Sequence, residues 1–376
     1  MSRLIDKNQG NPFEMQIEDE EYVTPPKTFW QKLKAVLSYV FIDGMSGMAI
    51  GLFATLIIGT IVENIGKLFG GQLAEYLKLA GQFAKFMMGA GIAVGMGYKL
   101  KKAPLVSISA GVVGMLASFV SKLETGISFP SVGEPLGAFI ASFVALEVGS
   151  LISGKTKIDV ILTPLVGIFS GAFIAFLIGN PIAEIMAFLS GIIRTAGEQQ
   201  PFLMGILVSV LMGVFLTLPI SSAAIGVTLG LDGIVAGAAV VGCCCQMVGF
   251  AVMSFRENKW GGLIAQGLGT SMLQMPNLMR KPVLWLPPVI ASAILGPISS
   301  CLLQMTSTKV GAGMGTAGLV GVIETFAAMS AMQEAWLVLL QILAIDILAP
   351  AIICFVISEI MRKMHWIEFG DLKLDL

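Results

Sequence analysis

Apolar stretches about as long as a membrane-spanning helix recur along most of this chain. A transmembrane helix needs about 20 consecutive apolar residues to cross the hydrocarbon core. Nine candidate spans meet this requirement, at 45–63, 80–98, 103–120, 135–153, 158–178, 201–218, 231–253, 283–303 and 335–358. Only 12% of the 376 residues are charged, whereas soluble domains carry about 25%. The sequence therefore predicts an all-α polytopic membrane protein.

Lysine and arginine residues near the span ends predict the orientation. The first span is flanked by Lys27, Lys32 and Lys34. Because basic loops stay in the cytoplasm, we expect a cytoplasmic N-terminus in the inner (plasma) membrane. The predicted parts are an N-terminal tail (1–34), a transmembrane domain (35–360) and a C-terminal tail (361–376). Arg362 and Lys363 reach the cytoplasm only if one further segment crosses, so we expect about ten passes.

Three polar, glycine-rich stretches interrupt the apolar pattern, at 219–230, 260–277 and 306–323. Irregular backbone at membrane depth is tolerated only where protein or a water-filled cavity satisfies its polar groups. Transporters place such broken segments at their solute sites. The first two stretches predict re-entrant hairpins or unwound helix ends that line a pathway. Residues 180–200 have helical periodicity and charged side chains, and predict an amphipathic helix on the membrane surface.

Hydrogen-bonding side chains coincide with helix-breaking residues in the first two of these stretches. The residues predicted to bind a small polar solute are Ser221, Ser222, Thr270, Ser271, Gln274 and Asn277, with Gly269 beside them. Gln246, in the middle of a predicted span, either lines the same pathway or links two helices. A membrane-buried hydrogen bond contributes only about 0.6 kcal/mol on average, so both interpretations of Gln246 stay open.

Other chemistry is less well supported by the sequence. Asp346 and Glu147 are the most internal carboxylates, and each either binds a proton or ion or forms a buried structural hydrogen bond. No nucleophile is paired with a base, and no phosphate-binding Gly-x-x-x-x-Gly-Lys sequence occurs. The five cysteines lack metal-ligand spacing, and no basic cluster points to nucleic acid. We therefore expect no catalytic residue, no metal and no cofactor in this chain.

Several short motifs carry a resemblance to a known family. They are Ile178-Gly-Asn-Pro-Ile-Ala, Leu218-Pro-Ile-Ser-Ser-Ala-Ala, Gln266-Gly-Leu-Gly-Thr-Ser-Met-Leu-Gln-Met-Pro-Asn and Gly313-Met-Gly-Thr-Ala-Gly-Leu-Val-Gly. Their order resembles the membrane-embedded EIIC component of phosphoenolpyruvate-dependent sugar phosphotransferase systems. Within that superfamily the chain looks most similar to stand-alone EIIC-like proteins of the perfringolysin-regulator type.

The resemblance implies a fold and a set of partners. It implies about ten helices with two re-entrant hairpins, an elevator-type architecture and a homodimer. It also implies separate EIIB and EIIA proteins, so that the chain is at most the membrane component of a sugar phosphotransferase. Sugar-transporting relatives carry a sugar-binding glutamate three residues after the glycine of the second hairpin. Here that position is Met272, and a thioether is too weak an acceptor to replace a carboxylate.

Two functions follow as hypotheses. The first is a permease subunit that moves a small polar solute, by resemblance a carbohydrate, across the inner membrane. The second is an EIIC-derived membrane sensor or regulator that does not transport. Met272 is the residue that keeps the second hypothesis open.

Overall fold

The computed structural model describes residues 29–120, 126, 129 and 133–374. The predicted N-terminal tail, 1–34, lies mostly outside these residues. The described part of the chain folds into helices joined by turns and by one longer non-helical segment, 303–316, and its only β-type pairing is an isolated bridge between Gly233 and Ser307. The prediction of an all-α fold is confirmed.

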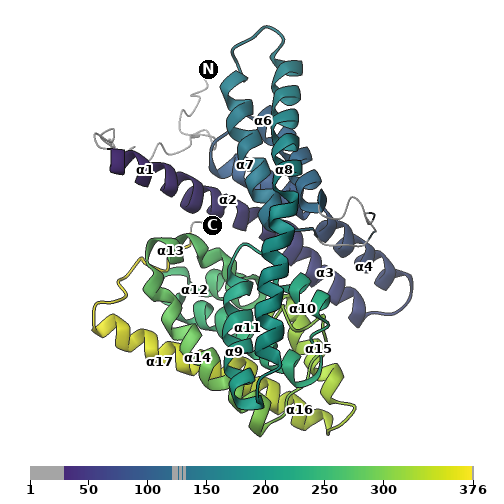
Figure 1. Ribbon diagram of the computed structural model, residues 1–376. Coiled ribbons are helices and arrows are strands. Elements are labelled where there is room, and N and C mark those ends of the chain that lie inside the picture. Colours follow the sequence, from purple (N-terminus) through teal and green to yellow (C-terminus); the bar gives the residue numbers. More distant parts are fainter. Residues whose placement is uncertain (1–28, 121–125, 127–128, 130–132, 375–376) are drawn as a thin grey trace, which may run out of the picture.

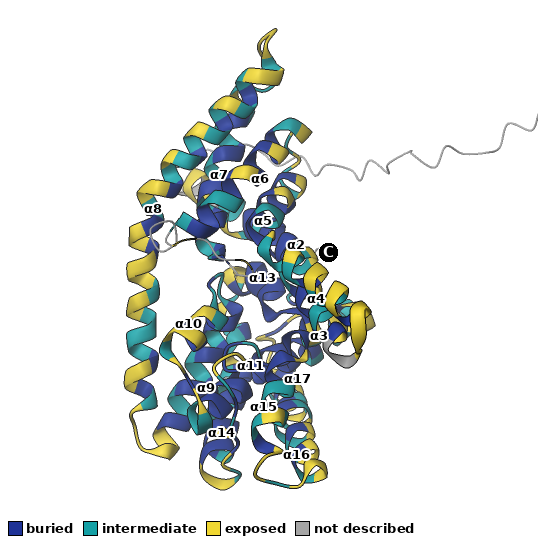
Figure 2. Ribbon diagram, turned by 90° about the vertical axis from the view of Figure 1, so that its right-hand side faces the viewer, coloured by how far each residue is buried: buried dark blue, intermediate teal, exposed yellow. Residues whose placement is uncertain are grey.

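The first helices form one long run that crosses the middle of the molecule. α1 (Phe29–Ser38), α2 (Met45–Leu52) and α3 (Ile58–Leu68) are joined by π-helical turns instead of loops. This run lies between an upper and a lower group of helices (Figure 1). The helices that follow it are α4 (Gly71–Phe86), α5 (Met88–Lys99), α6 (Pro104–Phe119) and α7 (Pro135–Ile152). Of these, α5, α6 and α7 make up most of the upper group (Figure 2).

One continuous helix, α8 (Asp159–Gly197), connects the two groups. Its 39 residues give a length of about 58 Å, and it runs along one side of the whole molecule (Figure 2). The prediction of a separate amphipathic helix at 180–200 is therefore wrong. A proline in a helix interior usually breaks or kinks the helix, but Pro181 is exposed and α8 continues past it. Before the proline, small residues at every fourth position form one buried face, namely Gly167, Gly171, Ala175 and Gly179.

The lower group is built around one buried helix. Every residue of α11 (Gly233–Met253) from Ala236 to Ala251 is buried, as expected of a helix that is apolar on all sides. The helices packed against it are α9 (Pro201–Thr217), α14 (Leu286–Pro297) and α17 (Ala349–Lys363). The shorter helices of this group are α10 (Ser222–Leu229), α12 (Phe255–Ile264), α13 (Met275–Arg280), α15 (Val320–Met329) and α16 (Ala335–Ile342).

Six helical segments of the described chain are long and apolar enough to cross a membrane. They are Ala35–Gly66, Pro135–Ile152, Asp159–Gly197, Gly233–Met253, Pro282–Leu302 and Ala335–Lys363. The pair α4 and α5, bent by 58°, makes a seventh if it counts as one span. Three more apolar helices are shorter, at Pro104–Phe119, Pro201–Thr217 and Ala317–Met329. The polytopic architecture is confirmed, whereas the count of ten and the two re-entrant hairpins stay predictions.

Glycines allow the backbones of the lower group to touch. A Cβ atom built on Gly242 of α11 would lie 1.8 Å from the carbonyl oxygen of Ser209 in α9. A Cβ atom on Gly296 of α14 would lie 2.1 Å from the carbonyl oxygen of Gly205, also in α9. Small residues at helix interfaces permit this approach in membranes, where dispersion contacts replace the hydrophobic effect as the driving force for packing.

We expect Gly242→Ala to destabilise the protein, because its methyl group must push α9 away from α11. Overpacking of this kind costs about 1–3 kcal/mol, which thermal unfolding of the purified protein in detergent will report as a lower melting temperature. The matched control is Gly191→Ala in α8, where a Cβ atom would meet nothing within 4 Å. The control should leave the melting temperature unchanged or raise it slightly. Equal melting temperatures for the two variants would show that α9 and α11 are not in backbone contact.

Candidate functional site

The polar stretch 260–277 forms a true interruption between two helices. After α12 the chain makes a π-helical turn at Ala265–Gly269 and then a single extended residue, Thr270, with φ −159° and ψ 141°. The Thr270 hydroxyl accepts a hydrogen bond from the Met272 N–H at 3.1 Å and so caps the next turn. Pro276 lies in the first turn of α13, where its missing N–H costs nothing. The local sequence therefore ends one helix and starts another inside the protein.

Three carboxamide side chains of this interruption form a continuous hydrogen-bonded row. Gln274 Nε2 donates to Gln266 Oε1 at 2.9 Å, and Asn277 Nδ2 donates to Gln274 Oε1 at 2.8 Å. At the start of the row, Gln266 Nε2 donates to the Ser254 hydroxyl at 2.7 Å. All three carboxamides are buried. Gln274 and Asn277 were predicted as site residues, and the structure places them side by side.

Ser271 belongs to a second polar cluster. Its hydroxyl lies 2.7 Å from that of Thr217 at the end of α9, and the Thr217 hydroxyl also lies 3.5 Å from Gln246 Oε1. Gln246 is fully buried, and its Nε2 has no hydrogen-bond partner within the described chain. Gln246 therefore links α11 to α9 and to the interruption while keeping one donor group free.

Ser221, Ser222 and Gly269 serve other contacts. Ser221 caps α10 by accepting from the Ala224 N–H at 3.2 Å. The Ser222 hydroxyl donates to the Gly313 carbonyl oxygen at 2.8 Å and so ties α10 to the glycine-rich stretch 306–323. A Cβ atom on Gly269 would lie 2.6 Å from the ring of Phe53, so this glycine packs against the first helical run. None of the three is hydrogen-bonded to the carboxamide row.

Met272 points into the apolar interior. It is 8% exposed and lies in the largest cluster of buried apolar side chains, together with Met275. The position at which sugar-transporting relatives are expected to carry a glutamate is therefore part of the core in this protein.

The C-terminal segment lies across the carboxamide row. Gln274 Nε2 donates to the Leu372 carbonyl oxygen at 2.9 Å, and Asn277 Nδ2 donates to that of Lys373 at 2.8 Å. Asn258 of α12 holds the same segment, because its Nδ2 donates to the Leu372 carbonyl oxygen and its Oδ1 accepts from the Leu374 N–H, at 2.8 and 2.9 Å.

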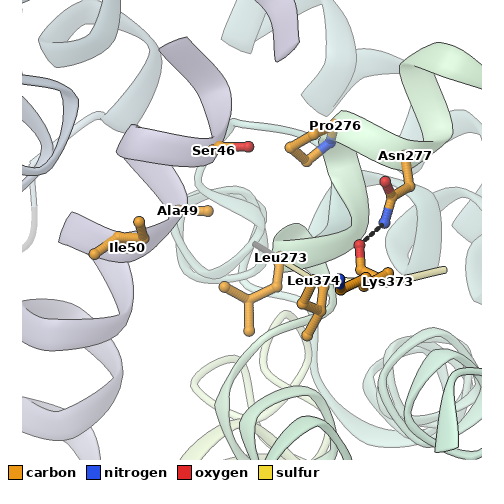
Figure 3. Close-up of a pocket in the computed structure, with 8 residues that line it drawn as sticks. All are labelled: Ser46, Ala49, Ile50, Leu273, Pro276, Asn277, Lys373 and Leu374. Atoms are coloured by element: carbon orange, nitrogen blue, oxygen red, sulfur yellow. Dashed lines mark hydrogen bonds between the residues drawn. The ribbon is translucent and has the colours of Figure 1, made fainter. Parts of the chain in front are cut away.

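A small cavity lies where this segment meets α2. Ser46 and Ala49 of α2, Pro276 and Asn277 of α13, and Leu374 are among the residues that line it (Figure 3). The space holds only about one water molecule. The predicted site residues Gln274 and Asn277 are thus covered by the chain's own C-terminal segment.

Residues that sequence reasoning missed complete the arrangement. Gln266 was noted only as the start of a motif, because the extended Thr270 lies between it and Gln274 and no helical spacing relates the two residues. Thr217 and Ser46 are single polar residues in apolar segments, and Asn258 lies in the charged run Arg256–Lys259, so none of the three stood out as a site residue. The part played by Leu372 and Lys373 rests on backbone carbonyls, which no side-chain pattern reveals.

The two internal carboxylates differ in their surroundings. Glu147 accepts a hydrogen bond from the Tyr39 hydroxyl at 2.8 Å and lies 2.9 Å from Lys102 Nζ, so it is paired at the edge of the upper group. Asp346 is fully buried in the last span, and neither carboxylate oxygen has a hydrogen-bond partner in the described chain. Among the described residues, no group of three histidine, cysteine or acidic side chains is arranged to hold a metal ion.

Most of the chain matches a known protein family. The family described as "Phosphotransferase system, EIIC" matches residues 42–374. The chain belongs to this family. No curated protein gives a significant match. The resemblance noted in the sequence is confirmed, and the EIIC protein is a multi-pass membrane component of the sugar phosphotransferase type. The matched range includes both the carboxamide row and the C-terminal segment that covers it.

The burial of Met272 in this EIIC protein can be tested by introducing the expected carboxylate. We expect Met272→Glu to destabilise the protein by about 2 kcal/mol or more, because the new group is buried without partners. The control Met272→Leu conserves volume and should cost less than about 1.5 kcal/mol. Thermal unfolding and size-exclusion chromatography measure both variants. A Met272→Glu protein as stable as the leucine variant would place residue 272 in a polar cavity.

A second test concerns the Lys281–Asp371 ion pair, whose atoms Nζ and Oδ2 lie 2.6 Å apart. Burial raises the pKa of Asp371, but hydrogen bonds from Lys281 and from the Glu368 N–H, with the charges of Lys281 and Arg362, bring it below its usual 3.8. Glu257, paired with Arg362, is the other carboxylate that faces this segment. A depressed folded-state pKa means that the stabilisation is complete above the unfolded value and is lost as the pH falls through the folded value.

Amide exchange of residues 368–374, corrected for intrinsic rates, should therefore stay slow from about pH 7 downward and accelerate only below pH 3.8. Asp371→Asn should remove this acceleration at low pH, because asparagine does not titrate. Glu359→Gln, which breaks the ion pair between Arg256 of α12 and Glu359 of α17, should preserve this acceleration. Release of the segment already near about pH 6 would assign the transition to a group with a higher pKa.

Proposed function

We propose that this EIIC protein is a permease subunit that carries a small polar solute, by family a carbohydrate, across the inner membrane. The observation that carries the proposal is the buried row of carboxamides, Gln266, Gln274 and Asn277, in an interrupted helix between two groups of membrane helices. Carboxamides both donate and accept hydrogen bonds, which suits the hydroxyl groups of a sugar. Helix interruptions at this depth are where transporters bind their solutes.

The site proposed for the solute comprises Thr270, Ser271, Gln274 and Asn277, with Gln246 behind Ser271. Ser271 and Gln246 join it through Thr217, and Gln246 keeps a free N–H in the same region. Ser221 and Ser222 contribute through the stretch 219–230, where Ser222 fixes the Gly313 backbone. The stretch 219–230 is therefore given a supporting role, and the stretch 260–277 makes the main contacts.

Phosphorylation of the solute during transport is less well supported in this protein than transport itself. Any phosphoryl donor is a separate EIIB protein, itself charged by EIIA. Because Met272 leaves the site without the expected carboxylate, we favour facilitated or ion-coupled passage. The subunit is proposed to work as a homodimer with its N-terminus in the cytoplasm.

The alternative function is a membrane sensor or regulator that keeps the EIIC fold without transport. One observation favours it: the donors of Gln274 and Asn277 are occupied by the chain's own C-terminal carbonyl groups. A site closed in this way suits a protein whose output is a conformational change.

Uptake by proteoliposomes across a panel of sugars, with and without the general phosphotransferase proteins and EIIB, tests the permease proposal. We expect Gln274→Ala combined with Asn277→Ala to reduce uptake about tenfold or more, because two hydrogen bonds to the solute are lost. The control Gln199→Ala removes a carboxamide at the exposed end of α8 and should leave uptake unchanged.

Two results would count against the proposal. Full uptake by the double variant would remove the solute site from the carboxamide row. No uptake of any panel member by the wild-type protein would favour the sensor.

A further inference from the structure

The C-terminal segment uses up the donors that a solute would need. A carboxamide has two N–H groups, and both are engaged in Gln274, by Gln266 Oε1 and the Leu372 carbonyl oxygen. Both are also engaged in Asn277, by Gln274 Oε1 and the Lys373 carbonyl oxygen. A solute can therefore accept hydrogen bonds from these two side chains only after Leu372 and Lys373 have moved away.

The same segment also fills the space beside these donors. Leu374 packs with Ala49, Phe53, Ala265 and Leu273, in a small apolar cluster that joins the first helical run to the interruption. The cavity left beside Leu374 is lined by Ser46 and Asn277 (Figure 3) and holds only about one water molecule. Withdrawal of Asp371–Leu374 would uncover both the donors and the surface of α2.

The groups that hold the segment share one chemical character. Gln274, Asn277 and Lys281 are spaced three and four residues apart, which is the spacing of one helical face. Each donates a hydrogen bond to the segment: two go to backbone carbonyl oxygens, and the third, from Lys281 Nζ, goes to the Asp371 carboxylate. Residue 272, where sugar-transporting relatives are expected to carry a glutamate, is a buried methionine and offers the solute no carboxylate. This face is therefore matched to a ligand with acceptor oxygens and a negative charge.

We propose that Asp371–Leu374 form a displaceable strap that occupies the solute site, and that the solute which replaces it is a sugar acid whose carboxylate takes the place of the Asp371 carboxylate on Lys281. The inference rests on the proposed function, because it concerns the same carboxamide row. A strap of this kind weakens binding, because the apparent dissociation constant for the solute is the intrinsic constant divided by the fraction of molecules in which the strap is open. Two residues close the strap without belonging to the solute site: Asn258, which binds the backbone of Leu372 and Leu374, and Asp371, whose partner Lys281 would be left for the solute.

The two halves of the ion pair distinguish this proposal from a structural role. Asp371→Asn weakens the strap but leaves Lys281 for the solute, so the dissociation constant for D-glucuronate should fall roughly twofold to fivefold. Lys281→Gln also weakens the strap but removes the partner of the solute carboxylate, so the dissociation constant should rise about tenfold or more. An ion pair that only stabilises the fold would give changes of the same sign in both variants.

Binding is measured on the purified full-length protein by titration calorimetry, with D-glucose as the uncharged comparison. Asn258→Ala should behave like Asp371→Asn, and the control Glu359→Gln should match the wild type, because its ion pair with Arg256 does not touch the strap. Hydrogen exchange gives a second readout. D-Glucuronate should accelerate exchange in residues 368–374 of the wild-type protein, and D-glucose should not.

Three outcomes would overturn the inference: no binding of D-glucuronate by any variant, equal binding of D-glucose, or the same sign of change in Asp371→Asn and Lys281→Gln. Failure of the permease proposal has a different signature. One result would support the strap and the sensor together. In that result Asp371→Asn lowers and Lys281→Gln raises the dissociation constant for D-glucuronate, but no solute enters proteoliposomes. If neutral sugars are transported while Asp371→Asn has no effect, the permease stands and the strap is only a part of the fold.

Discussion

A carboxamide buried among membrane helices must find partners for two donors and one acceptor, because lipid and apolar side chains supply none. In this EIIC protein Gln266, Gln274 and Asn277 meet the requirement by bonding in a row. The row leaves one donor on Gln274 and one on Asn277, and both are met by backbone carbonyl groups of the C-terminal segment. The helix interruption and the C-terminal segment thus share one hydrogen-bonded system. The N–H groups of Gln274 and Asn277 have all their partners only when this segment is in place.

The surrounding helices hold this system at a junction. On one side lies α2, which brings Ser46 and Ala49 to the cavity beside Leu374. On the other side lies α11, whose burial on all faces and glycine contact with α9 make the lower group compact. Because α13 touches the first helical run while α12 packs on α11, a shift of one helix group against the other would change the space at the carboxamide row. The long helix α8, which reaches both groups (Figure 2), is the covalent connection across that junction.

Much of this arrangement was predictable, and the parts that were not have definite physical causes. The apolar runs predicted helices close to those observed, such as 231–253 for α11 and 201–218 for α9, because hydrophobic length is set by the bilayer. The proline at 181 favours a break in the helix, but the helix α8 continues past it, and the residues alone do not reveal this. The pairing of Gln274 with Asn277 follows from their spacing of three residues. Their pairing with Leu372 and Lys373 joins positions almost a hundred residues apart through backbone atoms, which carry no sequence signal.

The buried methionine at 272 shows what the fold requires of this segment and what it does not. The interruption is held by the Thr270 cap, the early Pro276 and the carboxamide row. None of these contacts needs a carboxylate at residue 272. The interruption therefore forms without a carboxylate at residue 272, and the methionine there packs in the apolar core instead. The remaining side chains that face the C-terminal segment, from Gln274 to Lys281, mostly donate hydrogen bonds. If the solute binds here as proposed, the interrupted helix offers it mainly hydrogen-bond donors.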